Sequence, residues 1–566
     1  MPDVPVDPTA AALLLQRLCR HRIAQLFVNG GTDFPPLIEA YAQARARGVP
    51  VPRAVVCPHE QLALGMAHGH HLISGRPQAA MLHTNVGLAN GVLGLLNAHS
   101  DRVPLLLMSG RTPYRERGHA AARTLPIGWG QEMRDQAGLV REACKWEHEL
   151  RVADQAGLLV DRALAVAGST PKGPVYLALP REPLADAVPE ACFHEPVRQR
   201  PVVTAPDPAA VEEAAELLAA ARRPLVIAAR GPTSRSLFDR FARWLAHSGA
   251  AACSYWASRC AFPTDHPAHV GSDPEGWVER ADVVLVIDTL APWVPLHQRP
   301  AASARVIQLA PDPLFAHCPL RGFPVDVGVG GELELALSQL LDALEERGHA
   351  TEEAWRERRL RAHRALVLRC TRNGRAARGR PERLQLSRLL GELLAERPSS
   401  LFSELGADYA ATRRRDPLAW FKEPPAGGLG WSFPAALGAK LADPERDVVA
   451  VMGDGSYLFA NPEACLRTAA REGLAVLAVV VDNGCWGTVR QAVRELYPEG
   501  EAIRSNAVPM TDLGPRIDLT AGARAHGAFA ARVEAADALR PALEAALRAV
   551  REGQPALVQV LVEESG

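Results

Sequence analysis

Two apolar segments that each end in a short polar sequence constrain the fold of this chain most strongly. Val448–Met452 is an apolar run followed by GDGS at 453–456, and Leu474–Val481 is a second run followed by DNG at 482–484. An alanine-rich segment of helical character lies between them. This order predicts a strand–helix–strand unit, and ligands bind at the carboxyl ends of the strands in a parallel sheet.

The residues after these two strands suit a site for magnesium and a diphosphate. Gly453 and Gly455 allow a backbone to approach a phosphate closely. Asp454 offers a carboxylate and Asn483 an amide oxygen, and both are hard oxygen ligands of the kind that Mg²⁺ prefers. An ordinary tight turn followed by a chain-reversing Asn-Gly can have the same sequence. Spacing alone therefore does not decide between a Mg²⁺–diphosphate site and ordinary turns.

Length and composition indicate a multidomain globular protein. At 566 residues the chain is too long for one core, and about 150 residues per domain suggests three or four domains. The net charge of -1 argues against a general polyanion binder. Ten cysteines without a CxxC pair favour a reducing compartment. No signal-peptide pattern and no apolar run of about 20 residues is present, so we expect a cytoplasmic enzyme without a membrane partner.

Apolar strands alternate with helical segments in three parts of the chain, and this alternation predicts parallel sheets with helices on both faces. The predicted fold class is therefore α/β, with three doubly wound parallel-sheet domains. We place them at residues 1–190, 200–350 and 381–566, with a linker at 351–380. The strands predicted in the first two domains are Ile23–Val28, Ala54–Cys57, Gln78–His83, Pro104–Ser109, Gly173–Pro180, Pro224–Ala228, Val283–Ile287 and Arg305–Leu309.

The linker at 351–380 is rich in arginine, which raises nucleic-acid binding as an alternative function. Glutamates at 352, 353 and 357 interleave with these arginines. Such alternation is typical of a solvated helix. We therefore expect a linker helix and no nucleic-acid partner.

The GDGS and DNG sequences together resemble the fingerprint of thiamine diphosphate (ThDP)-dependent enzymes. The three α/β units resemble the pyrimidine-binding, central and diphosphate-binding domains of that family. The resemblance implies Mg²⁺ ligation by Asp454, Asn483 and the backbone carbonyl of Cys485. It also implies contacts to the cofactor from the residues around these ligands, namely Gly453, Asp454, Gly455, Ser456, Asn483, Cys485, Trp486 and Gly487. One departure is Asp482, which stands where the family usually has an asparagine and which brings a negative charge near the site.

Two further residues resemble cofactor-binding positions of this family. His59-Glu60, followed by the helical segment 63–69, resembles the glutamate that hydrogen-bonds N1′ of the aminopyrimidine. A carboxylate there favours the imino form, whose nitrogen takes the C2 proton. From the residues alone, Glu60 could instead complement a helix dipole. Leu429, between two glycines, resembles the bulky residue that bends the cofactor into a V, with core packing as the alternative.

Three segments resemble benzoylformate decarboxylases on the substrate side. The turn at 28–33 keeps a hydroxyl at Thr32, where the resemblance implies contact with the substrate carboxylate. The segments at 82–87 and 260–267 place His83 and His266 at positions of active-site histidines. A lone histidine is more often structural, so that alternative stays open for both.

The resemblance implies an enzyme that acts on a small 2-keto acid. The expected reaction is non-oxidative decarboxylation through an enamine to an aldehyde, in a homodimer or homotetramer with shared active sites. The alternatives are an acetolactate synthase-like carboligase and, more remotely, a non-catalytic nucleotide- or flavin-binding protein. The sequence does not indicate FAD. The segment 115–130 shapes either a site entrance or a subunit contact, and Arg490 and Arg494 either attract an anionic substrate or form a solvated face.

Overall fold

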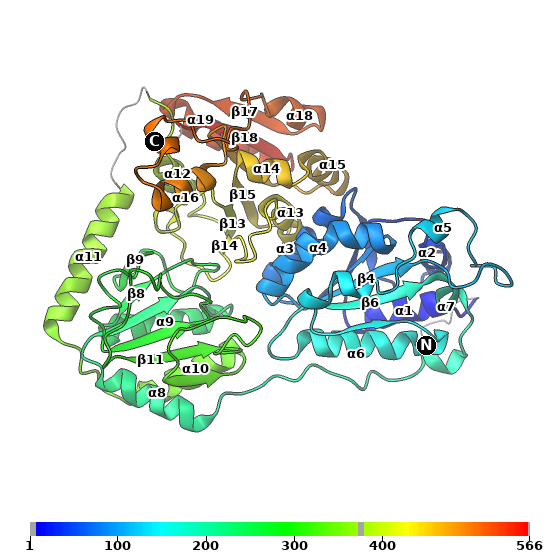
Figure 1. Ribbon diagram of the computed structural model, residues 1–566, viewed down its shortest axis with the longest axis horizontal. Coiled ribbons are helices and arrows are strands. Elements are labelled where there is room, and N and C mark those ends of the chain that lie inside the picture. The colour runs from blue at the N-terminus through cyan, green and yellow to red at the C-terminus, as the bar shows by residue number, and fades with distance from the viewer. Residues whose placement is uncertain (1–6, 372–378, 564–566) are drawn as a thin grey trace. The chain divides into compact units, whose positions relative to one another are not determined.

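The computed structural model describes residues 7–371 and 379–563, and they form three six-stranded sheets in which neighbouring strands pair in parallel (Figure 1). This arrangement confirms the predicted α/β class with three doubly wound sheets. Helices are interleaved with the strands along the chain. The part of the expected linker at 372–378 lies outside the described residues.

The first sheet has the strand order β2-β1-β3-β4-β6-β5. Its strands are β1 (Gln25–Val28), β2 (Arg53–Val56), β3 (Gln78–Leu82), β4 (Leu105–Arg111), β5 (Glu147–Glu149) and β6 (Val175–Pro180). Because β1 lies beside β3 and β3 beside β4, the segments that follow these three strands meet at one edge of the sheet. This edge carries most of the candidate site residues of the first domain.

The third sheet, with the order β14-β13-β15-β16-β18-β17, repeats the pattern of the first, whereas the second has the different order β12-β11-β10-β7-β8-β9. The second contains β7 (Pro224–Ala228), β8 (Ala251–Cys253), β9 (His269–Gly271), β10 (Val283–Ile287), β11 (Arg305–Ala310) and β12 (Val327–Gly330). The third contains β13 (Ser399–Glu404), β14 (Trp420–Lys422), β15 (Asp447–Gly453), β16 (Leu477–Asp482), β17 (Phe529–Val533) and β18 (Ala556–Leu561).

The helices differ in length and in how they begin and end. Helix α3 begins after His59, whose Nδ1 accepts the Gln61 N–H, and it ends at Gly75 in the left-handed conformation that favours glycine. The helices are α1 (Ala10–Arg20), α2 (Pro35–Arg47), α3 (Glu60–Ser74), α4 (Thr84–Ser100), α5 (Ile127–Gly130), α6 (Ala156–Gly168), α7 (Arg181–Ala185), α8 (Pro208–Ala220), α9 (Arg235–Ser248), α10 (Leu333–Glu345), α11 (Glu353–Thr371), α12 (Arg383–Leu393), α13 (Ser432–Ala442), α14 (Asp454–Phe459), α15 (Pro462–Glu472), α16 (Gly487–Leu496), α17 (Glu501–Arg504), α18 (Thr520–Ala525) and α19 (Leu539–Arg551).

The chain forms two compact units, and each unit is built from three separate segments of the sequence. The first unit comprises Met1–Val202, Glu423–Pro444 and Phe459–Leu474, and the second comprises Val203–Lys422, Glu445–Leu458 and Ala475–Gly566. Helices α13 and α15 therefore belong with the first sheet, although the strand between them, β15, belongs to the third.

Burial explains the apolar runs from which the strands were predicted. Strand β16 is buried along its whole length, as is β15 up to Met452. Strands that are covered on both faces have continuous apolar sequences, and such strands are typical of parallel sheets. In the expected linker, α11 buries Trp355, Arg359, Leu366 and Cys370 and exposes much of the rest. Among the described residues, no helix is long and apolar enough to cross a membrane.

Candidate active site

Glu60 is the first residue of α3, and it is buried, with only 8% of the residue exposed. Asn90 on α4 donates to Glu60 Oε2 over 3.3 Å. Among the residues that the structure describes, it is the only hydrogen-bond donor to this carboxylate. A Cβ at Gly87 would lie 3.1 Å from Glu60 Oε1, so glycine leaves room for the acid. A buried carboxylate with one donor can accept a further hydrogen bond, as N1′ of an aminopyrimidine would require.

Leu429 is brought to the same end of α3 by close helix packing within the first unit. Helices α3 and α13 meet at glycines: a Cβ at Gly69 would lie 1.8 Å from the Ala435 carbonyl oxygen, and one at Gly438 would lie 1.9 Å from that of Met66. This contact leaves Leu429 half-buried beside Gln61, whose amide lies 3.5 Å from its carbonyl oxygen.

Asn97 of α4 holds the turn that carries Leu429. Its amide nitrogen donates to the Gly428 carbonyl oxygen over 2.8 Å, and its amide oxygen accepts the Gly428 N–H over 3.1 Å. A buried Asp101–His68–Trp431 chain of hydrogen bonds holds the next turn of the loop. Sequence reasoning left His68 unassigned and did not identify Asn97.

His83 is held by two side chains that sequence reasoning also missed. Its Nδ1 is hydrogen-bonded to the carboxylate of Asp33, which is 4% exposed, and its Nε2 lies 3.2 Å from the amide nitrogen of Gln131. The hydrogen bond with Asp33 raises the pKa of His83, while burial opposes this change. A Cβ at Gly87 would also lie 3.5 Å from His83 Cβ, so Glu60 and His83 border the same residue.

Two glycines make the Asp33–His83 pair possible. A Cβ at Gly31 would lie 2.1 Å from His83 Nδ1, and one at Gly110 would lie 1.6 Å from Asp33 Oδ2. Both distances are far below van der Waals contact, so neither position accepts a larger residue unless the pair moves. Gln136 fixes the strand end at Gly110, because its amide nitrogen donates to the Gly110 carbonyl oxygen over 2.8 Å.

A pocket in the first unit lies beside this pair. It is bordered by Thr32 after β1, by Thr84 at the start of α4, and by the end of β4. The segment 115–130 supplies much of the remaining wall, through Arg123, Thr124, Leu125, Ile127 and Gly128. This segment therefore lines a pocket next to the candidate site.

In the second unit, the loops after β15 and β16 bring two carboxylates together. Asp454 Oδ2 accepts the N–H of Gly484 over 2.8 Å, and Asp482 Oδ1 accepts the same N–H over 3.1 Å. Burial, and then the charge of Asp482, raise the pKa of Asp454. A cation would offset this repulsion between like charges, which fits the expected Mg²⁺ site.

Asp482, the departure from the family pattern, has partners of its own. Gln559 donates to its Oδ2 over 2.7 Å, and Arg516 Nε lies 3.7 Å from its Oδ1. Arg516 also donates to the Asn483 carbonyl oxygen over 3.0 Å. The extra charge at 482 is therefore partly compensated by an arginine. The amide oxygen of Asn483 accepts the Cys485 N–H over 3.2 Å and has a second lone pair for a ligand.

The glycines at 453 and 455 have different surroundings. A Cβ at Gly453 would meet nothing within 4 Å, so the strand end is open to a ligand. A Cβ at Gly455 would lie 2.2 Å from the Trp486 ring, so this glycine allows the tryptophan to pack. Ser456 is buried in the first turn of α14, and Gly487 begins α16. An open strand end, a carboxylate, an amide oxygen and a nearby carbonyl fit a metal-bound diphosphate.

His266 and the two arginines of α16 lie elsewhere in the second unit. Nδ1 of His266 accepts the Ala268 N–H over 3.1 Å, and burial lowers the pKa of this histidine to about 4. Arg490 donates to the Thr511 hydroxyl over 2.8 Å, and it is half-buried, like Arg494. The contacts of His266 suit a structural histidine, and its catalytic role stays a prediction.

Comparisons with known proteins agree with this geometry. The N-terminal thiamine pyrophosphate-binding domain of thiamine pyrophosphate enzymes matches residues 8–139, and the C-terminal binding domain matches residues 404–560. The chain is 29% identical to benzoylformate decarboxylase of Pseudomonas aeruginosa, over 96% of this chain and 97% of that protein. It is 28% identical to the acetolactate synthase large subunit IlvG of Mycobacterium tuberculosis, over 98% and 96%.

A solved structure agrees on the fold. Benzoylformate decarboxylase from Polynucleobacter necessarius superimposes with a TM-score of 0.81 at 22% identity, covering 98% of this chain and 99% of that one. The residues that match the N-terminal domain include Glu60, and those that match the C-terminal domain include the GDGS and DNG loops. The chain therefore belongs to the thiamine diphosphate-dependent enzymes, within the group that includes benzoylformate decarboxylases and acetolactate synthases.

Proposed function

We propose that this enzyme uses ThDP and Mg²⁺ to decarboxylate a small 2-keto acid to an aldehyde. The observation that carries the proposal is His83, held between Asp33 and Gln131 beside the pocket that contains Thr32. When a 2-keto acid loses CO₂, the electrons of the broken bond stay on the former keto carbon. That carbon must then take up a proton to give an aldehyde, and a fixed histidine with a raised pKa suits this transfer.

The first unit contributes the groups that act on the organic part of the cofactor. Bound ThDP supplies an electron sink for the electrons left by CO₂. Glu60 would hold a proton at N1′ of the pyrimidine, and Leu429 would pack against the cofactor. Thr32 donates a hydrogen bond to the substrate carboxylate, and His83 moves the proton to the product. His266, which belongs to the second unit, is a second candidate for this transfer.

The second unit contributes the metal ligands. Asp454, Asn483 and the carbonyl of Cys485 would hold Mg²⁺, and Gly453 would let the diphosphate approach the backbone. Glu60 and Asp454 belong to different compact units, and we expect the two halves of a site to come from different chains of a homodimer or homotetramer.

A carboligase is the second candidate, because the chain is almost as similar to an acetolactate synthase large subunit as to a benzoylformate decarboxylase. Both reactions lose CO₂ from a 2-keto acid. They differ in what the carbon accepts next, which is a proton in the decarboxylase and a second carbonyl compound in the carboligase.

A product screen separates the candidates. The full-length protein, ThDP and Mg²⁺ are incubated with a panel of 2-keto acids, and the CO₂ and the carbonyl products are measured. We expect one aldehyde per CO₂ released. A hydroxyketone would instead indicate the carboligase, and no CO₂ from any member of a broad panel would contradict both. His83→Gln is expected to reduce aldehyde formation while leaving ThDP binding unchanged.

A further inference from the structure

The pocket beside Thr32 contains three arginines, and their partners differ. The pocket lies within the first unit, at the edge where β1, β3 and β4 end. Its arginines are Arg111, Arg123 and Arg181. Whether the pocket attracts an anion depends on which of these cations already has a carboxylate partner.

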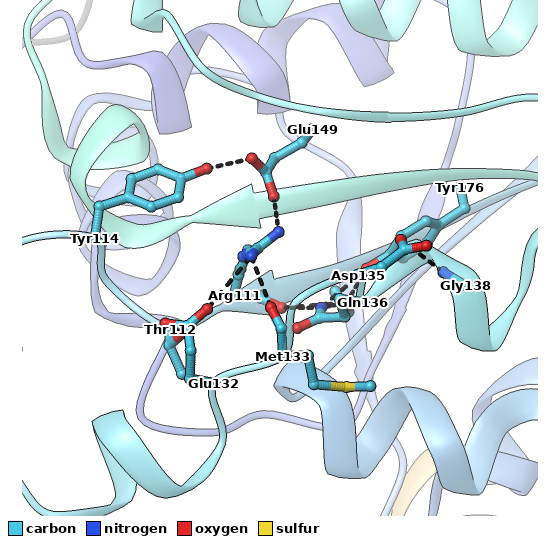
Figure 2. Close-up of polar contacts among 12 residues, drawn as sticks. Arg111, Thr112, Tyr114, Glu132, Met133, Asp135, Gln136, Gly138, Glu149 and Tyr176 are labelled. Atoms are coloured by element: carbon cyan, nitrogen blue, oxygen red, sulfur yellow. Dashed lines mark hydrogen bonds and ion pairs between the residues drawn. The ribbon is translucent and has the colours of Figure 1, made fainter.

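Arg111 and Arg123 are both paired. Figure 2 shows Arg111 between two acids: it forms an ion pair with Glu149, and its Nη2 lies 3.3 Å from Glu132 Oε1. Glu132 is also the ion-pair partner of Arg123 and accepts a hydrogen bond from the Thr112 hydroxyl over 2.8 Å. Two carboxylates thus compensate two guanidinium groups.

Arg181, the first residue of α7, has only neutral partners. Its guanidinium donates to the Ala121 carbonyl oxygen over 2.9 Å, to that of Thr32 over 3.3 Å, and to that of Ala122. Among the described parts of the chain, no carboxylate pairs with it. Three of its five N–H groups are used in these bonds, so the side chain is held in place, keeps its full charge and has two donors left.

The other charged groups near the pocket do not offset Arg181. Asp33 is committed to His83. Glu182, the next residue on α7, is buried, accepts the Arg115 N–H over 2.9 Å and does not line the pocket. The remaining wall includes the hydroxyl-bearing side chains of Thr32, Thr84, Thr112 and Thr124. A guanidinium that is fixed in place and surrounded by hydroxyl groups can bind an oxyanion through two parallel N–H···O hydrogen bonds, as a bidentate pair.

We propose that this pocket binds an oxyanion on the side chain of the substrate, with Arg181 as its partner, so that the enzyme prefers 2-keto acids with a second acidic group. The inference rests on the proposed 2-keto acid chemistry for its placement, because Thr32 lines this pocket together with both partners of His83, Asp33 and Gln131. The second group is a carboxylate or another oxyanion of similar size. Arg111 and Arg123 stay paired with Glu132 and Glu149 and shape the wall.

Calorimetry with two unreactive ligands tests the inference. Glutarate and pentanoate have the same chain length, but only glutarate has a second carboxylate, and neither contains a keto group. They are titrated into the full-length enzyme loaded with ThDP and Mg²⁺. We expect the wild type to bind glutarate about 10- to 100-fold more tightly than pentanoate, the range for a hydrogen-bonded charge pair. Arg181→Gln should abolish this preference, and Arg181→Lys should keep part of it.

Arg162→Gln is the matched control. Arg162 is exposed on α6 in the same unit, so this change alters the net charge equally but leaves the pocket intact, and the preference should persist. Equal affinities of the wild type for the two ligands would overturn the inference. If Arg181→Gln lowered the affinity for glutarate and for pentanoate equally, the inference would be overturned too, because Arg181 would then bind the reacting carboxylate that both ligands represent. If Arg181→Gln fails to fold, the wild-type comparison and Arg181→Lys still decide.

The two proposals fail separately. The ligand preference is measured without any reaction, whereas the proposed decarboxylation is measured by CO₂ release. A wild type that prefers glutarate but releases no CO₂ from any 2-keto acid would refute the decarboxylase and leave the oxyanion pocket in place.

Discussion

Replacing Asp33 by asparagine should make the stability of the protein depend on pH in a different way. The pair with His83 is buried, since the Asp33 side chain is 4% exposed and that of His83 is 17% exposed, so solvent screens it little. A charge-assisted hydrogen bond of this kind contributes about 2 kcal/mol. The Asp33→Asn side chain keeps the shape and can still accept a hydrogen bond, but it loses the negative charge.

The sign of the effect follows from the pKa of His83, which the hydrogen bond with Asp33 raises in the folded state. The stabilisation is fully present below the unfolded-state pKa of about 6.5 and is lost as the pH rises through the folded-state value. We therefore expect Asp33→Asn to lower the free energy of unfolding most at pH 5–6. The difference from the wild type should shrink at higher pH. Urea titrations of both proteins across pH 5–9 measure this difference.

Asp186→Asn is the matched control, because Asp186 pairs with His119 over 2.9 Å but its side chain is 51% exposed. A surface pair of this kind is worth at most about 1 kcal/mol. A difference between Asp33→Asn and the wild type that does not vary with pH would refute the reasoning. So would a difference no larger than that of the control.

Three further predictions concern the cofactor and the glycines. Glu60→Gln should slow deuterium exchange at C2 of bound ThDP by about 10²–10⁴-fold, with ThDP affinity changed much less; NMR after acid quench measures the rate, and a wild-type rate would contradict the role of Glu60. Asp454→Ala should abolish Mg²⁺-dependent ThDP binding, which calorimetry measures. Mixing Asp454→Ala chains with Glu60→Gln chains should restore some activity if two chains share each active site. No recovery after demonstrated subunit exchange would count against shared active sites. Gly110→Ala should destabilise the fold by about 1–3 kcal/mol, because its Cβ would overlap Asp33, whereas Gly130→Ala meets open space and should change stability little.

Long apolar runs made most of the sheet strands predictable. The run Val448–Met452 ends within one residue of β15 on both sides, because buried parallel strands are apolar on both faces. The run Leu474–Val481 begins three residues before β16, which is Leu477–Asp482. Four longer strands, β12, β13, β17 and β18, were not predicted. The short strands β5, β8, β9 and β14, which contain three residues each, were not predicted either. Three residues are too few to establish a period, and three of these strands lie at sheet edges.

The candidate site was predicted where a local motif carries it and missed where the fold assembles it. Glu60, His83 and Asp454 each follow or precede a recognisable strand end. Asp33 does too, but its pairing with His83 depends on β1 lying beside β3, which no local pattern states. Gln131 comes from an irregular loop, and only the folded chain brings it to His83.

The division of the chain into two compact units has a consequence for any attempt to dissect the protein. The chain enters the first unit three separate times, and α13, which packs on the glycine face of α3, is encoded more than 200 residues after the first segment ends. A fragment that stops at Val202 would expose this face and would lack the turn held by Asn97. The first unit is therefore not a transplantable module, and a chimaera with a relative must exchange all three segments together.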